Sequence, residues 1–197
     1  MRVKLYTPPA EEPITRAEVK TQVRVDAEDE DYYIDAMIKA IREDVQSHLG
    51  RALITQTYDY YLDAWPVTNY MKLPMPPLQS VTSITYTDVD GTSAIFSSSN
   101  YLVDTISEPG RIYLKNGQSW PSVNLQVVNP IVVRYVAGYG LAADVPMAIK
   151  QAMLLLAGTL FENRESVVVG NISQAALIGG AEALMAKLRI PYMENYG

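Results

Sequence analysis

The chain has 197 residues, a formal net charge of −6 and a sequence pI near 4.8, and it contains no cysteine. This length suits one domain, or a core with one sizeable insertion, and the 48% hydrophobic content is ordinary for a folded protein. The composition excludes disulfides, thiolate catalysis and cysteine-ligated metals, and it disfavours tight binding to nucleic acid, which depends on Lys and Arg.

The N-terminal residues predict an arm followed by a short helix. The first 13 residues hold three prolines and two glutamates, which favours an extended arm. Thr15 and Glu18 then have the spacing of a capping box, in which each side chain closes an exposed amide of the first helical turn. Ile14 and Val19 flank the box as a hydrophobic staple. The predicted helix runs from Thr15 to about Val23.

Residues 26–49 predict a longer helix. Five carboxylates between Asp26 and Asp31 suit the positive N-terminal end of a helix, and Gly50 is well placed to end it. These carboxylates also resemble the oxygen ligands of Ca²⁺ or Mg²⁺, but the loop glycine and ligand spacing of an EF-hand are missing, so helix capping is the favoured interpretation. Apolar residues recur at helical spacing along this segment: Ile34, Met37, Ile38, Ile41, Val45 and Leu49.

From Arg51 the apolar pattern changes from helical to alternating, which is typical of strands. Asp90 and Gly91 mark a hairpin turn between two of them. We therefore expect a small antiparallel β module over residues 51–137, inserted between helices. Tyrosine is abundant in the chain, with 14 residues, and it is common both at protein interfaces and on strand surfaces, so both interpretations stay open. The predicted strands are 55–62, 81–87, 94–96, 101–103, 111–114 and 131–136.

The C-terminal part predicts two more helices. Asp144 is expected to cap the first, with Pro146 in its first turn, and the helix continues to Phe161. It is apolar almost all round, so we expect it to be buried from several sides and to pack against the helix that ends at Leu49. After a loop at 163–173, residues 174–188 predict a last helix, and residues 191–197 an extended tail.

These elements predict an α+β fold: a helical core of about four helices with an inserted small antiparallel β module. The expected divisions are 1–50 for the arm and first helices, 51–137 for the β module, 138–190 for the C-terminal helices and 191–197 for the tail.

Residues suited to catalysis are scarce. His48 is the only histidine, and its position near the end of a helix favours a structural role over that of a base or ligand. The segment from Gly138 to Gly140 is too short for a phosphate-binding loop and is better interpreted as a turn after a strand. Glu162 and Glu165, on either side of Asn-Arg, either pair with charges across a subunit boundary or end a helix. We therefore expect no enzyme activity and no cofactor.

Several segments, in order and with family-like spacing, together resemble the head–tail connector (adaptor) proteins of long-tailed bacteriophages, prophages and gene transfer agents. The most characteristic is 50–58, Gly-Arg-Ala-Leu-Ile-Thr-Gln-Thr-Tyr, where a helix end leads into the first strand. The resemblance covers roughly Ile14 to Arg189. Its other segments are 13–20, 29–31, 36–49, 73–81, 86–91, 109–112, 118–121, 136–140, 145–146 and 161–165.

The resemblance implies a helical core with a β insertion and no catalytic motif. It also implies a ring of about twelve subunits beneath the portal at the capsid vertex. Such a ring extends the DNA channel and carries the stopper and tail, and DNA passes through it without tight binding. The chain would be made in the bacterial cytoplasm and would lie in the neck of a virion or phage-like particle, with no membrane contact. The run from Ile172 to Gly180 and the tail beyond Arg189 depart from the expected pattern.

Partner binding is expected at the C-terminal end. Arg189, Tyr192, Met193 and Tyr196 are the candidate partner-binding residues, because the tail exposes aromatic side chains without enough local sequence to bury them. A tail that folds back on its own subunit is the alternative. For the whole chain, the second hypothesis is a carbohydrate- or protein-binding module that uses its tyrosine-rich β module as the recognition face. A small hydrolase acting through carboxylates is a remote third.

Overall fold

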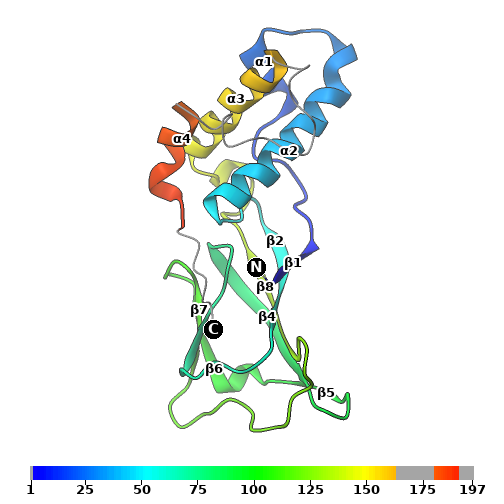
Figure 1. Ribbon diagram of the computed structural model, residues 1–197. Coiled ribbons are helices and arrows are strands. Elements are labelled where there is room, and N and C mark those ends of the chain that lie inside the picture. Colours follow the sequence, from blue (N-terminus) through cyan, green and yellow to red (C-terminus); the bar gives the residue numbers. More distant parts are fainter. Residues whose placement is uncertain (1, 163–179, 191–197) are drawn as a thin grey trace. The chain divides into compact units, whose positions relative to one another are not determined.

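The computed structural model describes residues 2–162 and 180–190, and these residues form two compact units (Figure 1). The β unit consists of residues 2–9 and 55–138. The helical unit consists of residues 10–54, 139–162 and 180–190. The fold is α+β, as the sequence predicts, and each unit has its own set of buried side chains.

The helical unit contains four α-helices among its described residues. These are α1 (Arg16–Val23), α2 (Asp31–Leu49), α3 (Met147–Glu162) and α4 (Gly180–Met185). Three short 3₁₀ turns accompany them in the described part of this unit: η1 (Glu28–Glu30), η3 (Ala142–Asp144) and η6 (Ala186–Leu188). No helix in this described part of the chain is long and apolar enough to cross a membrane.

The helix ends confirm two sequence predictions and correct one. Thr15 and Glu18 form the capping box of α1, and Gly50 ends α2 with a left-handed φ of 64°. Asp144, however, does not cap α3. Its carboxylate accepts a hydrogen bond from the Leu141 amide and closes η3, whereas α3 begins at Met147. The carbonyl of Pro146 accepts the first amide bonds of α3, so the proline precedes the helix instead of lying in its first turn.

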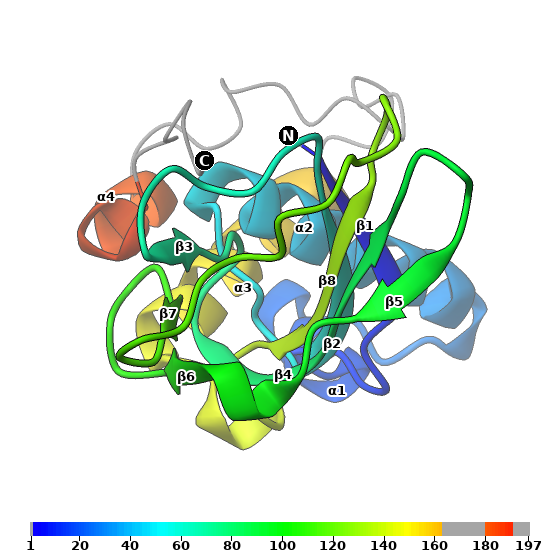
Figure 2. The same ribbon diagram turned by 90° about the horizontal axis from the view of Figure 1, so that it is seen from below.

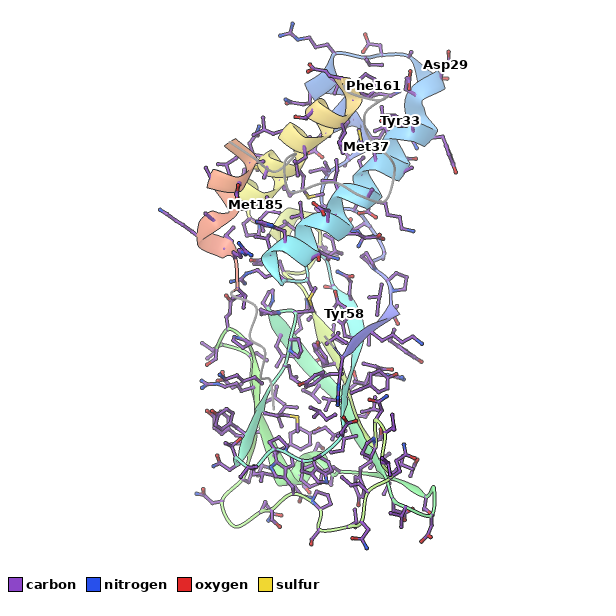
Figure 3. All side chains as sticks on the ribbon, viewed as in Figure 1. Asp29, Tyr33, Met37, Tyr58, Phe161 and Met185 are labelled. Atoms are coloured by element: carbon purple, nitrogen blue, oxygen red, sulfur yellow. The ribbon has the colours of Figure 1, made fainter. Side chains whose placement is uncertain are left out.

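The core of the helical unit lies between α2 and α3, with α1 and α4 also packed on α3. Figure 3 shows Tyr33 of α2 near Phe161 of α3. Their ring centroids are 6.3 Å apart. This confirms that the two long apolar helices pack together. The α2 and α3 side chains predicted to meet in this core are all buried: Ile38, Ile41, Val45, Ile149, Met153, Leu156 and Leu160.

The β unit contains two antiparallel sheets. The first has five strands in the order β1-β2-β8-β4-β5, and the second has three strands in the order β3-β7-β6. The strands of the first sheet are β1 (Val3–Thr7), β2 (Gln56–Leu62), β4 (Leu78–Thr87), β5 (Ser93–Ile95) and β8 (Ile131–Ala137). Those of the second are β3 (Tyr70–Lys72), β6 (Tyr101–Asp104) and β7 (Arg111–Leu114). A 3₁₀ turn, η2 (Ser98–Asn100), joins β5 to β6.

The β part is larger than the small insert predicted from the sequence. The predicted strands are all present, but β4 begins at Leu78 instead of Val81, and β3 was not expected. The N-terminal arm also contributes β1, which pairs antiparallel with β2 at the edge of the larger sheet. The alternating apolar pattern and the residue composition did not identify these two strands. The reason is that β1 buries none of its side chains and β3 has only three residues.

Strand β1 is fixed to the larger sheet mainly through polar contacts. Arg134 on β8 holds Asp59 on β2 with two hydrogen bonds of 2.8 and 2.9 Å, and the Tyr6 ring covers its guanidinium at 3.4 Å. The hydrogen bond to Asp59 raises the pKa of Arg134 above its usual range. Arg2, just before the strand, pairs with Asp63. Tyr58 and Tyr135 stack in the same unit, with ring centroids 5.8 Å apart.

Candidate assembly surfaces

The acidic segment around the start of α2 is partly a structural ion-pair cluster. Arg16 of α1 bonds both Asp31 and Asp35, and Lys20 pairs with Asp31. Lys20 and Arg16 together lower the pKa of the Asp31 carboxyl. These contacts join α1 to α2. Of the other four carboxylates in this segment, Asp26, Glu28 and Asp29 are exposed and Glu30 is half-buried, and Figure 3 labels Asp29 at this end of α2.

Among the residues that the structure describes, no arrangement of side chains suited to catalysis stands out. His48 is half-buried in the last turn of α2, one turn after Asp44. Burial raises the pKa of Asp44, and the neighbouring His48 opposes that shift. Within residues 2–162 and 180–190, no three His, Cys, Asp or Glu side chains lie close enough to hold a metal ion.

The start of the C-terminal segment is fixed to the end of α2. The Ile190 amide donates a hydrogen bond of 2.9 Å to the Leu49 carbonyl, and the buried Arg51 side chain donates to the Leu188 carbonyl. Arg189 lies between these two anchored residues, and its side chain is exposed. The position of Arg189 is therefore set by backbone bonds on both sides. The other three candidate residues, Tyr192, Met193 and Tyr196, lie outside the described residues.

A surface that the sequence did not reveal is formed by three loops at one end of the β unit. We call residues 63–69, 88–92 and 121–130 the loop surface. These loops follow β2, follow β4 and precede β8, so antiparallel pairing brings them to the same end of the sheet, the lower end of this unit in Figure 1 and the end from which Figure 2 is viewed.

Hydrogen bonds join the three loops to one another and to the sheet. The Val89 amide donates to the Asn124 carbonyl at 3.0 Å, and the Gln126 amide donates to the Thr87 carbonyl at 3.2 Å. The Asn129 amide donates to the Asp63 carboxylate at 3.0 Å, which lowers the pKa of that carboxyl. The loops are therefore held together as one surface.

Aromatic rings support the loop surface. Trp65 and Trp120 stack almost parallel, with centroids 5.2 Å apart and an interplanar angle of 8°. Trp120 also donates a hydrogen bond of 2.9 Å from its indole nitrogen to the Thr68 carbonyl. Phe96 contacts both tryptophans, and Tyr86 packs edge-on against Trp65. The packing of these four aromatic rings helps to fix the backbone of the loops beside them.

Five valines on this surface are exposed. Val67 is fully exposed, Val127 is 89% exposed and Val128 is 65% exposed. A single exposed apolar side chain is ordinary, but a group of them on one ordered surface is typical of an interaction site. The only sequence signal was the occurrence of valines in a turn-rich segment, 121–130, where no strand was expected. The complete set is Val67, Val89, Val123, Val127 and Val128.

Comparison with known proteins gives a consistent result. A family model described as "Head completion protein" matches residues 12–171. A chain in the neck of an empty gene transfer agent (GTA) particle, computed with C6 symmetry, has a TM-score of 0.80 at 20% identity. Chains in the virion of the native GTA particle and in its neck, computed with C12 symmetry, each have a TM-score of 0.74 at 19% identity. Each alignment covers 100% of both chains. No curated protein matches the chain significantly.

Proposed function

Because the chain belongs to the head completion protein family, we propose that it is the adaptor of a phage or phage-like particle. It is a structural head completion protein and not an enzyme. In the proposed role it forms an oligomeric ring in the particle neck, between the portal and the stopper or tail proteins, and the ring extends the DNA channel.

The observation that carries this proposal is the full-length match in fold to chains of particle necks. The alignment takes in both the helical part and the β part, from end to end of both chains. Those necks were computed with C6 and C12 symmetry. A ring of about twelve subunits is therefore proposed for this chain too, with each subunit using one surface to contact the next copy and a different one to receive the previous copy.

The charge of the chain suits a position beside DNA that must move. Twelve subunits of net charge −6 give a ring with a formal charge of about −70, which repels the phosphate backbone and does not hold it. The charge is unevenly placed, since residues 10–54 carry 11 acidic and 6 basic side chains, whereas the β unit carries six of each.

The C-terminal segment is the proposed contact with the portal. Arg189 lies near the end of the described part of the helical unit, between residues fixed by the Leu49 and Arg51 contacts. The aromatic residues Tyr192 and Tyr196 and the apolar Met193 follow it in sequence. Aromatic and Arg side chains are frequent anchors at protein interfaces. We propose that these four residues bind the portal.

Deletion of residues 191–197 tests this contact. The truncated chain is expected to melt within about 2 °C of the full chain, because its anchors at residues 188–190 remain, and to lose co-assembly with purified portal rings. Arg189→Ala is the matched single change and should weaken co-assembly. A fall of many degrees in the melting temperature of the truncated chain would instead show that the tail belongs to the fold.

Electron cryomicroscopy of the particle neck tests the proposed position. The expected result is a ring of this chain between portal and stopper. A particle that contains the chain elsewhere, or lacks it, contradicts the proposal. Light scattering of the isolated chain is a weaker test, because such a ring can depend on the portal as a template.

A further inference from the structure

The loop surface exposes valines that the β unit does not need for its own packing. Trp65 and Trp120 already stack on each other, and hydrogen bonds already fix the loop backbones. Val67 and Val127 point so far out that nearly all of each side chain contacts solvent. Burial of such a group against a partner is favourable, because it removes apolar surface from water.

The charges around the valines indicate what kind of protein surface would be complementary. The three loops contain no Lys or Arg. The charge of Asp63 is neutralised by its ion pair with Arg2. The Asp88 carboxylate has no such pairing with Arg2 and accepts hydrogen bonds from the amides of Asp90 and Thr92 in its own turn. Asp88 and Asp90 flank the exposed Val89 in the same loop, so this surface combines apolar side chains with acidic charge. A complementary surface is apolar with basic side chains beside it.

We infer that the loop surface binds a different protein of the particle, through an apolar patch on that protein edged by Lys or Arg. This inference rests on the proposed function, because it places the chain in an assembly. The same loop surface on a second copy of the chain is a poorer fit for two reasons. The same surface facing itself would bring the acidic side chains of both copies together, and a two-fold contact of this kind does not build a closed ring from neighbouring subunits.

Aspartate substitutions on the loop surface test the inference. Val127→Asp puts a charge on one exposed valine of the loop surface, and Val67→Asp does so on another loop. Ile106→Asp is the matched control, because Ile106 is 93% exposed and lies in the β6–β7 loop, outside the loop surface. All three positions are exposed, so we expect each variant to fold with an unchanged melting temperature and to enter the particle.

The expected result is that particles carrying Val127→Asp or Val67→Asp contain the variant chain but lose one neighbouring neck protein, with at least a tenfold fall in particle activity. Particles carrying Ile106→Asp should be complete. In parallel, a photo-crosslinking residue at 127 in otherwise wild-type particles should give an adduct with a different protein, at a point next to Lys or Arg.

The outcomes separate this inference from the proposed function. If wild-type particles lack the chain, the proposed function is wrong and the inference fails with it. If the chain is present but both aspartate variants give complete, active particles, the inference alone is wrong. An adduct of twice the mass of the chain, which would show a second copy at this surface, also overturns it.

Discussion

At the scale of single residues, the best-defined interaction in the β unit is the contact of Arg134 with Asp59. Asp59 is buried, and Arg134 donates two hydrogen bonds to its carboxylate, while Tyr6 covers the guanidinium from β1. When a buried carboxylate loses its partner, the free energy of unfolding falls by more than the net contribution of the intact pair. The reason is that the desolvation of the carboxylate is then no longer compensated.

Arg134→Met should therefore destabilise the protein by about 1–3 kcal/mol. Arg2→Met is the matched control, because it breaks an ion pair in which both side chains are about half exposed, 58% and 41%, and such pairs contribute about 0–1 kcal/mol. Denaturant melts of both variants measure the difference. Equal losses of stability in the two variants would show that the burial of Asp59 does not determine the effect of Arg134→Met.

At the scale of elements, the packing of α2 on α3 makes Ile41 a central contact. Its side chain is fully buried in the core of the helical unit. Ile41→Ala should cost about 2–5 kcal/mol, the usual penalty for a large-to-small core substitution. Tyr32→Ala on the exposed side of the same helix is the control, and it should change stability by no more than about 0.5 kcal/mol. A loss below that value for Ile41→Ala in denaturant melts would contradict the packing described here.

The turn between β6 and β7 is expected to depend on pH. The Asp104 carboxylate accepts hydrogen bonds from the side chain and amide of Ser107, from Arg111 and from the Ile106 amide, and these contacts lower its pKa. A lowered pKa means that the folded chain favours the charged form. The stabilisation is therefore present above the pKa of the unfolded state, about 3.9, and is lost as the pH falls through and below that value.

Asp104→Asn removes the titrating group and tests this dependence. The variant should be less stable than wild type at pH 7 and should show a smaller fall in stability between pH 5 and pH 2. Melts across that range, with Asp90→Asn as a control on another turn, provide the comparison. An unchanged pH profile for Asp104→Asn would show that this carboxylate does not contribute.

At the scale of the whole molecule, the acidic charge predicts negligible affinity for duplex DNA at physiological salt. The chain has 16 basic and 22 acidic side chains, and binding to phosphates depends on Lys and Arg. A fluorescence anisotropy titration should show no saturation at micromolar protein. Micromolar, salt-sensitive binding would contradict the prediction and the proposed way in which DNA passes.

Sequence reasoning worked where local signals act alone. The capping box at Thr15 and the glycine at position 50 were predicted because each acts within one helical turn. The cap assigned to Asp144 was wrong because a competing local bond, to the Leu141 amide, lies within three residues. Strand β1 was missed because its partner, β2, lies about fifty residues away in sequence and no side chain of β1 is buried.

For the candidate surfaces too, the sequence predicts local features but not those that depend on long-range strand pairing. Arg189 was selected from its position in the sequence, and the structure adds the two contacts that anchor its neighbours. The loop surface could not be predicted, because its five valines come from three loops that only strand pairing brings to one end of the sheet. Apolar residues in turn-rich segments are ambiguous until that pairing is known.

The placement of β1 has a consequence for aggregation. Strand β2 pairs with β8 on one side and with β1 on the other, so the first residues of the chain cover backbone groups that would otherwise be open to any extended peptide. Lys4 and the prolines at positions 8 and 9 are features that discourage further strand addition. If β1 detached before assembly, the β2 edge would become a template for wrong pairing between chains. We therefore expect β1 to reduce association of free subunits through their sheets.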